Sequence, residues 1–123
     1  MASIDIFIGA PIEHESERAT LVRAVAFLSA QGISAVVLAN VNLGGRQIDL
    51  VIGLDQGALV VESKALSSAV RGSENGGWQV RLRSGRWKEI PNVYAQALNE
   101  KLALRDAMVA FARADAPYPD AAV

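Results

Sequence analysis

The sequence predicts an α/β domain in which a mixed central β-sheet is flanked by helices. Three observations predict this fold class. An amphipathic helical pattern stands near the start of the chain, a second one stands near its end, and strand patterns joined mostly by hairpins lie between them. The 123 residues are 51% hydrophobic and 20% charged, which is enough apolar material for one core. We expect residues 1–115 to form a single domain and residues 116–123 to form a flexible tail or linker.

Residues 16–31 are predicted to form the first helix. Ser16 is suited to cap it, and Gly32 stands where a left-handed residue would end it. Glu17 falls at helical spacing with the apolar residues and is therefore expected on the buried face. The apolar residues of that face are Leu21, Ala24, Val25 and Leu28.

Three strands are predicted next, at residues 33–43, 47–53 and 58–64. The first is rich in β-branched residues and ends at a pair of glycines. The second and third are separated by Leu-Asp-Gln-Gly at positions 54–57, which predicts a hairpin. Residues 65–77 are polar and rich in Gly and Ser, so we expect a connection there.

A second hairpin is predicted from residues 78–83 and 86–90 around a two-residue turn, Ser84-Gly85. That register places Trp78, Val80, Leu82 and Trp87 on one face, Arg83 opposite Arg86, and Arg81 opposite Lys88 on the other. Like charges in direct opposition are unfavourable without an anion between them, so we predict that these four cations bind a phosphate backbone. An ordinary solvated face relieved by nearby glutamates is the alternative. A long helix, residues 91–114, then completes the domain.

Composition excludes several kinds of chemistry. The chain has no Cys, which excludes disulfides, cysteine nucleophiles and thiolate zinc sites, and its only histidine, His14, makes a histidine metal cluster or a Ser-His triad improbable. Twelve Lys+Arg against 13 Asp+Glu give a net charge of −1 and hence no bulk attraction to polyanions. No targeting segment or membrane span is evident, so we expect a cytoplasmic protein without a membrane partner.

Two acidic residues lie where strands should be apolar. If the first hairpin closes with Leu54 opposite Gly57, then Asp49 lies opposite Glu62, and Lys64 shares their face. Opposed carboxylates repel unless a cation lies between them, and their oxygens suit Mg²⁺ or Mn²⁺. The alternative is a structural salt bridge to the lysine. An acid at position 17 would complete the metal site, or would simply be favoured there by the helix dipole.

These residues form an ordered series that resembles a known family. Asp49 followed by Glu62-Ser63-Lys64 resembles the D…ExK signature of the PD-(D/E)xK nuclease superfamily. A wider series adds the earlier Glu17, the later Trp78 and the segment Pro-Asn-Val-Tyr-Ala-Gln-Ala, which contains Gln96. This wider series resembles the nuclease-related (NERD) domain from Glu17 to Met108. Two departures are visible: the family's usual Asn-Pro order is reversed at positions 91–92, and Glu100 stands where a related pattern has Tyr.

The resemblance implies a restriction-endonuclease-like core and a divalent-metal-dependent phosphodiesterase. It implies Asp49 and Glu62 as metal ligands with the Ser63 carbonyl as a third, Lys64 as the catalytic lysine, Glu17 as an accessory acid, and Gln96 near the scissile phosphate. The expected function is therefore an endonuclease that uses Mg²⁺ or Mn²⁺ and acts on DNA.

Two alternatives to this function stay open. One is a non-catalytic module that keeps the nuclease fold and binds nucleic acid or protein. The other alternative concerns the partners of the protein. RNA stays open as a substrate, and a second copy of the chain in a homodimer or a fused or associated domain beyond the C-terminus stays open as a partner. No base-reading helix is evident, so sequence specificity is not expected.

Overall fold

The computed structural model describes residues 3–64, 68–112 and 119–123 of the chain, and the side chains of all of these except residues 109–112. Its elements in order are β1 (Ile4–Ile8), α1 (Glu15–Ala30), β2 (Ala35–Leu43), β3 (Arg46–Leu54), β4 (Gly57–Val61), β5 (Val70–Arg71), β6 (Trp78–Arg81), β7 (Trp87–Ile90), α2 (Val93–Ala112) and β8 (Asp120–Ala122). None of the helices in these ranges is long and apolar enough to cross a membrane.

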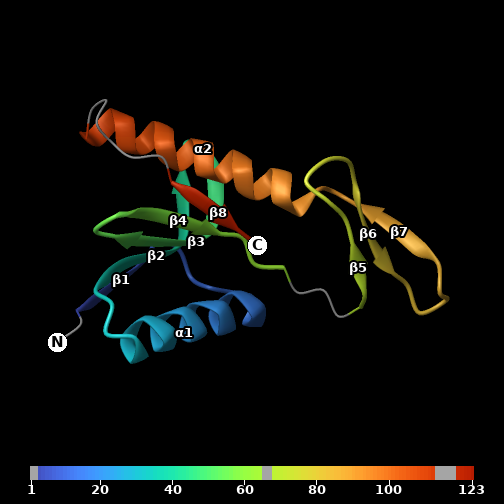
Figure 1. The fold of residues 1–123 in the computed structure, drawn as a ribbon, viewed down its shortest axis with the longest axis horizontal. Helices are drawn as coiled ribbons and strands as arrows, with labels where there is room; N and C mark the ends of the chain where they lie inside the picture. Colours follow the sequence, from blue (N-terminus) through green and yellow to red (C-terminus); the bar gives the residue numbers. More distant parts are fainter. Residues whose placement is uncertain (1–2, 65–67, 113–118) are drawn as a thin grey trace.

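The described strands form a mixed five-stranded sheet, in the order β1-β2-β3-β4-β8, and a three-stranded sheet, β5-β6-β7. In the large sheet the two outer pairings are parallel and the two inner ones are antiparallel. The two helices cover its opposite faces, and the small sheet lies beyond the start of α2 (Figure 1). The predicted α/β fold with a mixed, helix-flanked sheet is therefore confirmed.

Each helix packs against the large sheet through its own apolar cluster. On the α1 side the buried residues are Leu28, Ala35, Val37, Ala39 and Leu50, and Leu21 and Ala24 pack against them as the helical spacing predicts. On the α2 side they are Ile48, Val51, Val60 and Leu104. Burial of both sheet faces explains why the central strands are almost continuously apolar.

Strand β2 changes face at Asn40. Ala39 packs toward α1, whereas Val41, two residues later, packs toward α2. A regular strand would place residues two apart on the same face. The change is made by the left-handed backbone of Asn40, with φ 51°, a conformation that Asn tolerates better than most residues. Its amide donates to the carbonyls of Ala10 and Pro11 at 3.1 and 2.9 Å, which holds the segment before α1 against the sheet.

Strand β3 makes the same change at Asp49. Ile48 packs toward α2, whereas Leu50 packs toward α1. In the ladder with β2, both of these residues are paired, but Asp49 between them is not. The interruption falls beside the interruption in β2. Asp49 is therefore unpaired at the position where the ladder between β3 and β4 also ends.

The first predicted hairpin has the predicted register. Leu54 pairs with Gly57, and the ladder runs to Leu50 opposite Val61. Asp49 and Glu62 are the next residues on the two strands, so both leave the hairpin at the same end. Beyond the ladder, the Glu62 N–H donates to Ala122 of β8 at 2.8 Å.

The second hairpin differs from its prediction by one residue. Leu82 N–H donates to the Arg86 carbonyl and Gly85 N–H to the Leu82 carbonyl, so the turn has three residues, with Gly85 at φ +85°. The predicted oppositions of Arg83 with Arg86 and of Arg81 with Lys88 are therefore wrong. Arg81 lies opposite Trp87 and Lys88 lies opposite Val80, which separates the cations across the two faces.

Three strands were not predicted. β1 pairs in parallel with β2 through a short apolar segment, and β5 lies within the predicted connection, of which residues 65–67 are outside the described chain. β8 falls within residues 116–123, for which a flexible tail is predicted. Residues 116–118 are outside the description, but Asp120–Ala122 pair in parallel with β4, whose outer edge would otherwise offer unpaired backbone groups.

Candidate functional site

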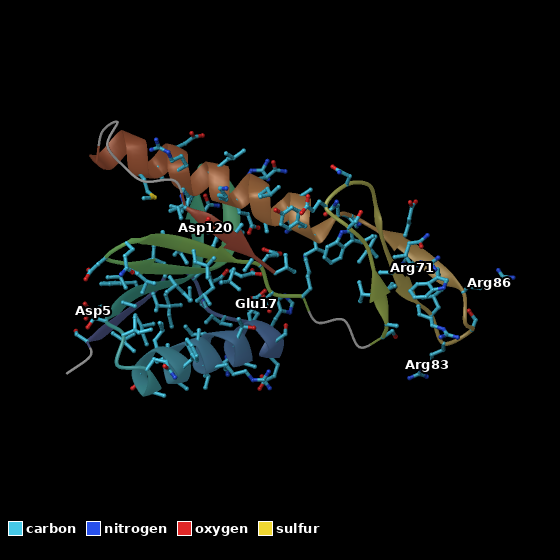
Figure 2. The ribbon with its side chains drawn as sticks, in the orientation of Figure 1. Asp5, Glu17, Arg71, Arg83, Arg86 and Asp120 are labelled. Carbon is cyan, nitrogen blue, oxygen red and sulfur yellow. The ribbon has the colours of Figure 1, made fainter. Side chains whose placement is uncertain are left out.

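Carboxyl groups from four elements approach one another at one end of the large sheet. They belong to Glu17 in the first turn of α1, Asp49 in β3, Glu62 directly after β4, and Glu100 in α2. Partial burial and then the Asp49 charge raise the pKa of Glu17, and Glu62 adds to the rise. Sequence analysis predicts three of these acids together, and the structure brings them together. Figure 2 shows Glu17 between α1 and the sheet.

Glu62 is the most constrained of these acids. The residue is only 3% exposed. Its Oε1 accepts a hydrogen bond from Gln96 Nε2 at 3.0 Å and forms an ion pair with Lys64 Nζ at 3.2 Å. Its Oε2 is buried and has no N–H or O–H donor among the described residues. A buried carboxylate oxygen without a partner is costly, so this atom calls for a hydrogen-bond donor or a cation.

Glu100 is the carboxyl group next to it. The residue is 2% exposed, and its Oε2 also lacks a donor among the described residues. Burial, followed by its hydrogen bond to Glu62 and the charges of Glu62 and Asp49, raises the pKa of Glu100 to about 8. Near neutral pH Glu100 therefore keeps its proton, because an acid buried beside other carboxyl groups ionises less readily than one in water.

Asp49 is held by the segment that follows β4. Its Oδ2 accepts the backbone N–H of Ser63 at 2.9 Å, and the Ser63 hydroxyl lies 3.1 Å from the Thr20 hydroxyl of α1. The backbone of Ser63 is thus fixed between β3 and the first helix. This contact explains how Asp49 and Glu62 remain neighbours although the ladder itself stops one pair earlier.

The predicted site residues differ in how closely the structure groups them. Lys64 contacts Glu62 directly, so the salt bridge weighed as the alternative is present; Gln96 contacts Glu62 from α2. The four cations predicted to bind nucleic acid, Arg81, Arg83, Arg86 and Lys88, are exposed on the small sheet and its turn. Figure 2 places Arg83 and Arg86 at the outer tip of this sheet, away from Glu17.

The donor set fits a hard divalent cation. Glu62 Oε2 is a buried oxygen without a donor, and Asp49 keeps one oxygen outside its contact with Ser63. In the described part of the chain, no three His, Cys, Asp or Glu side chains are arranged to hold a metal ion by themselves. An ion here would need a backbone carbonyl and water beside the two carboxylates, which is the usual coordination of Mg²⁺.

Sequence analysis missed two residues of this cluster. Glu100 was noted only as a departure from a family pattern, yet it is buried against Glu62. The available signal was its spacing of four from Gln96, which puts both side chains on one face of α2. Thr20 gave no signal, because its contact with Ser63 joins residues 43 positions apart.

Comparison with known proteins gave one family match. The family model described as nuclease-related domain (NERD) matches residues 13–119, which is most of the chain and includes every acid of the cluster. Searches of curated proteins and of solved structures each gave no match to the chain. The matched range begins at the segment that leads into α1 and ends just before β8. On the strength of this match, the chain belongs to the nuclease-related domain family.

Proposed function

We propose that this chain is a nuclease that uses Mg²⁺ or Mn²⁺ to hydrolyse phosphodiester bonds in DNA. The observation that carries the proposal is the buried Glu62 carboxylate, whose Oε2 lacks a donor while Asp49 and Lys64 lie beside it. A structural salt bridge alone would not need a second acid, Asp49, beside the Glu62–Lys64 pair.

In this proposal Asp49, Glu62 and the Ser63 carbonyl hold the cation. When bound, the cation would supply a polarised water and positive charge for the phosphate in the transition state. Gln96 keeps Glu62 in position by donating to Oε1, and the Ser63 N–H does the same for Asp49. Both contacts reduce the conformational freedom that the ligands would lose on binding an ion.

Lys64 is the charged group best placed to meet a phosphate. Its side chain is 35% exposed and its Nζ lies 3.2 Å from Glu62 Oε1, so it reaches from the carboxylates to the surface. There it stabilises the negative charge that develops on the phosphate oxygens. Glu17, whose pKa is raised, acts as an accessory acid that can hold a proton at the edge of the site.

The small sheet supplies the proposed DNA contacts away from the reacting phosphate. Arg83 and Arg86 lie at its tip, and Arg71 stacks on the Trp87 ring at 4.0 Å on the face that also carries Arg81. Phosphate contacts of this kind position a duplex without reading its sequence.

A second candidate is a DNA-binding module without turnover. It is favoured by the absence, among the described residues, of a group of three ligating side chains, and by the ion pair that already occupies Glu62 Oε1. In that case the carboxyl cluster is structural and the basic residues alone carry the function.

Nicking of supercoiled plasmid in Mg²⁺ or Mn²⁺ distinguishes the two. We expect the wild-type protein to nick and Glu62→Ala and Lys64→Ala to lose this activity. Asp55→Asn, at the far end of the same hairpin, and Lys101→Ala, on α2, serve as matched controls and should retain it. DNA and Mn²⁺ binding without nicking would favour the module, and nicking that survives in Glu62→Ala would reject the assigned site.

A further inference from the structure

A groove of about 650 Å³ opens beside Lys64 and follows one side of α1. It extends along the helix from Thr20 to Phe27, and seven residues of α-helix rise about 10 Å. The end of β4, Val123 and the small sheet form the remaining walls. The groove therefore begins at the carboxylate site and leads away from it.

Two of the residues that line this groove, Phe27 and Trp78, are aromatic. Phe27 is 61% exposed, so its ring is accessible to an occupant of the groove. Trp78 is half-buried, and its indole N–H already donates to the Ser73 carbonyl at 2.9 Å. What both rings offer to an occupant is therefore an apolar face rather than a hydrogen bond.

Two cations line the same groove. Lys64 lies at the end nearest the carboxylates, and Arg23 lies on α1 between Thr20 and Phe27. Positive side chains alternating with flat aromatic surface are the features by which proteins bind single-stranded nucleic acid, because cations contact the phosphates while the rings stack on bases. A wholly apolar partner would leave both cations without a complement.

We propose that this groove binds the unpaired strand on one side of the reacting phosphate. The preferred substrate is then single-stranded DNA, or duplex DNA with a single-stranded segment. One base stacks on Phe27, the next phosphate contacts Arg23, and the reacting phosphate reaches Lys64. Base faces are covered in an intact duplex, so only an unstacked strand can use this wall. The inference rests on the proposed function, since it places the strand relative to the same site.

The test measures binding and cleavage separately. Fluorescence anisotropy in EDTA compares a fluorescein-labelled oligothymidylate with a labelled duplex of equal length. The proteins are wild type, Phe27→Ala, Arg23→Gln and the matched control Phe7→Ala, whose ring is 58% exposed on β1, outside the groove. Thermal unfolding of each variant establishes that it is folded, and cleavage of both DNAs in Mn²⁺ is measured in parallel.

We expect Phe27→Ala to weaken binding of the oligothymidylate about tenfold and binding of the duplex less than about twofold, as loss of one stacked base predicts. Arg23→Gln should also act mainly on the single strand, and Phe7→Ala on neither. Equal affinities of the Phe27→Ala and Phe7→Ala variants for the oligothymidylate would overturn the groove assignment, even if the protein cleaves DNA. Phe27-dependent binding without cleavage would support the groove while rejecting the proposed nuclease.

Discussion

Gln96 on α2 and Glu62 after β4 are joined by a hydrogen bond of 3.0 Å from Nε2 to Oε1. The bond connects the second helix to the end of the central hairpin across 34 positions of sequence. It ends on an acid that is almost completely buried, so it orients the carboxylate and satisfies part of its hydrogen-bonding requirement.

Gln96→Ala should lower both stability and activity. Loss of a donor to a buried carboxylate costs about 1.5–3 kcal/mol, and the freed Glu62 side chain would no longer hold one orientation. Urea unfolding measures the first effect and the plasmid nicking rate the second. Asn99→Ala, which removes an exposed amide from the same helix, is the control and should change neither by much. An unchanged unfolding free energy in Gln96→Ala would show that the bond contributes nothing to the fold.

Stability should fall as pH rises from about 4.5 to about 8 through the effect of Glu100. In the folded chain, burial and a hydrogen bond to Glu62 raise the pKa of Glu100 from 4.5 to about 8. Over that range the unfolded state releases a proton that the folded state keeps, so deprotonation favours unfolding. The slope approaches about 1.4 kcal/mol per pH unit at most for one group.

Glu100→Gln tests this pH dependence, because Gln keeps the shape and cannot ionise. Denaturant unfolding in EDTA at several pH values should show the wild type losing stability relative to the variant as pH rises. Parallel profiles for the two proteins would contradict the raised pKa.

Asn40→Ala should destabilise the protein more than Asn40→Gly. Alanine loses both hydrogen bonds to the segment before α1 and must adopt a left-handed backbone, which costs roughly 1–2 kcal/mol for a residue with a Cβ. Glycine loses only the hydrogen bonds. Thermal unfolding should therefore rank the variants as wild type above Gly above Ala. If Ala proves as stable as Gly, the backbone conformation at this position does not determine the cost.

Removal of the tip cations should reduce the salt dependence of DNA binding. Arg83→Ala combined with Arg86→Ala removes two exposed charges from the turn of the small sheet. If both contact phosphates, the slope of log K against log salt should fall by about 1.8, or about 0.9 for each contact. Arg46→Ala, an exposed cation at the start of β3, provides the comparison. An unchanged slope would place the DNA elsewhere.

The local parts of the fold were predictable from sequence, and the long-range parts were not. The hairpin register that brings Asp49 and Glu62 together follows from a four-residue turn, and both helices follow from their apolar spacing. The second hairpin was mispredicted because a two-residue and a three-residue turn both fit Ser84-Gly85, and one residue moves Lys88 to the other face. β8 was missed because three residues of low hydrophobicity become a strand only when β4 offers an edge.

The site was predictable to a similar extent. Asp49 and Glu62, on the two adjacent strands of one hairpin, can be paired from spacing, and Lys64 can be placed on their face in the same way. The position of Glu100 against Glu62 depends on the packing angle of α2, and the contact of Thr20 with Ser63 depends on that of α1. Neither angle is encoded in a short segment. For this reason, sequence analysis identified the acids that leave the hairpin but not Glu100, the helix residue hydrogen-bonded to Glu62.

The bond between the Glu62 N–H and the Ala122 carbonyl also has a consequence for synthesis of the protein. The elements that carry the four acids are complete once residue 112 has been made, but β8 consists of residues 120–122. The ribosome builds the chain from its N-terminus, so a nascent polypeptide lacks this last clamp on Glu62 until residue 122 has emerged. The backbone N–H of Glu62 therefore gains its hydrogen-bond partner only after the rest of the sheet and both helices have been synthesised.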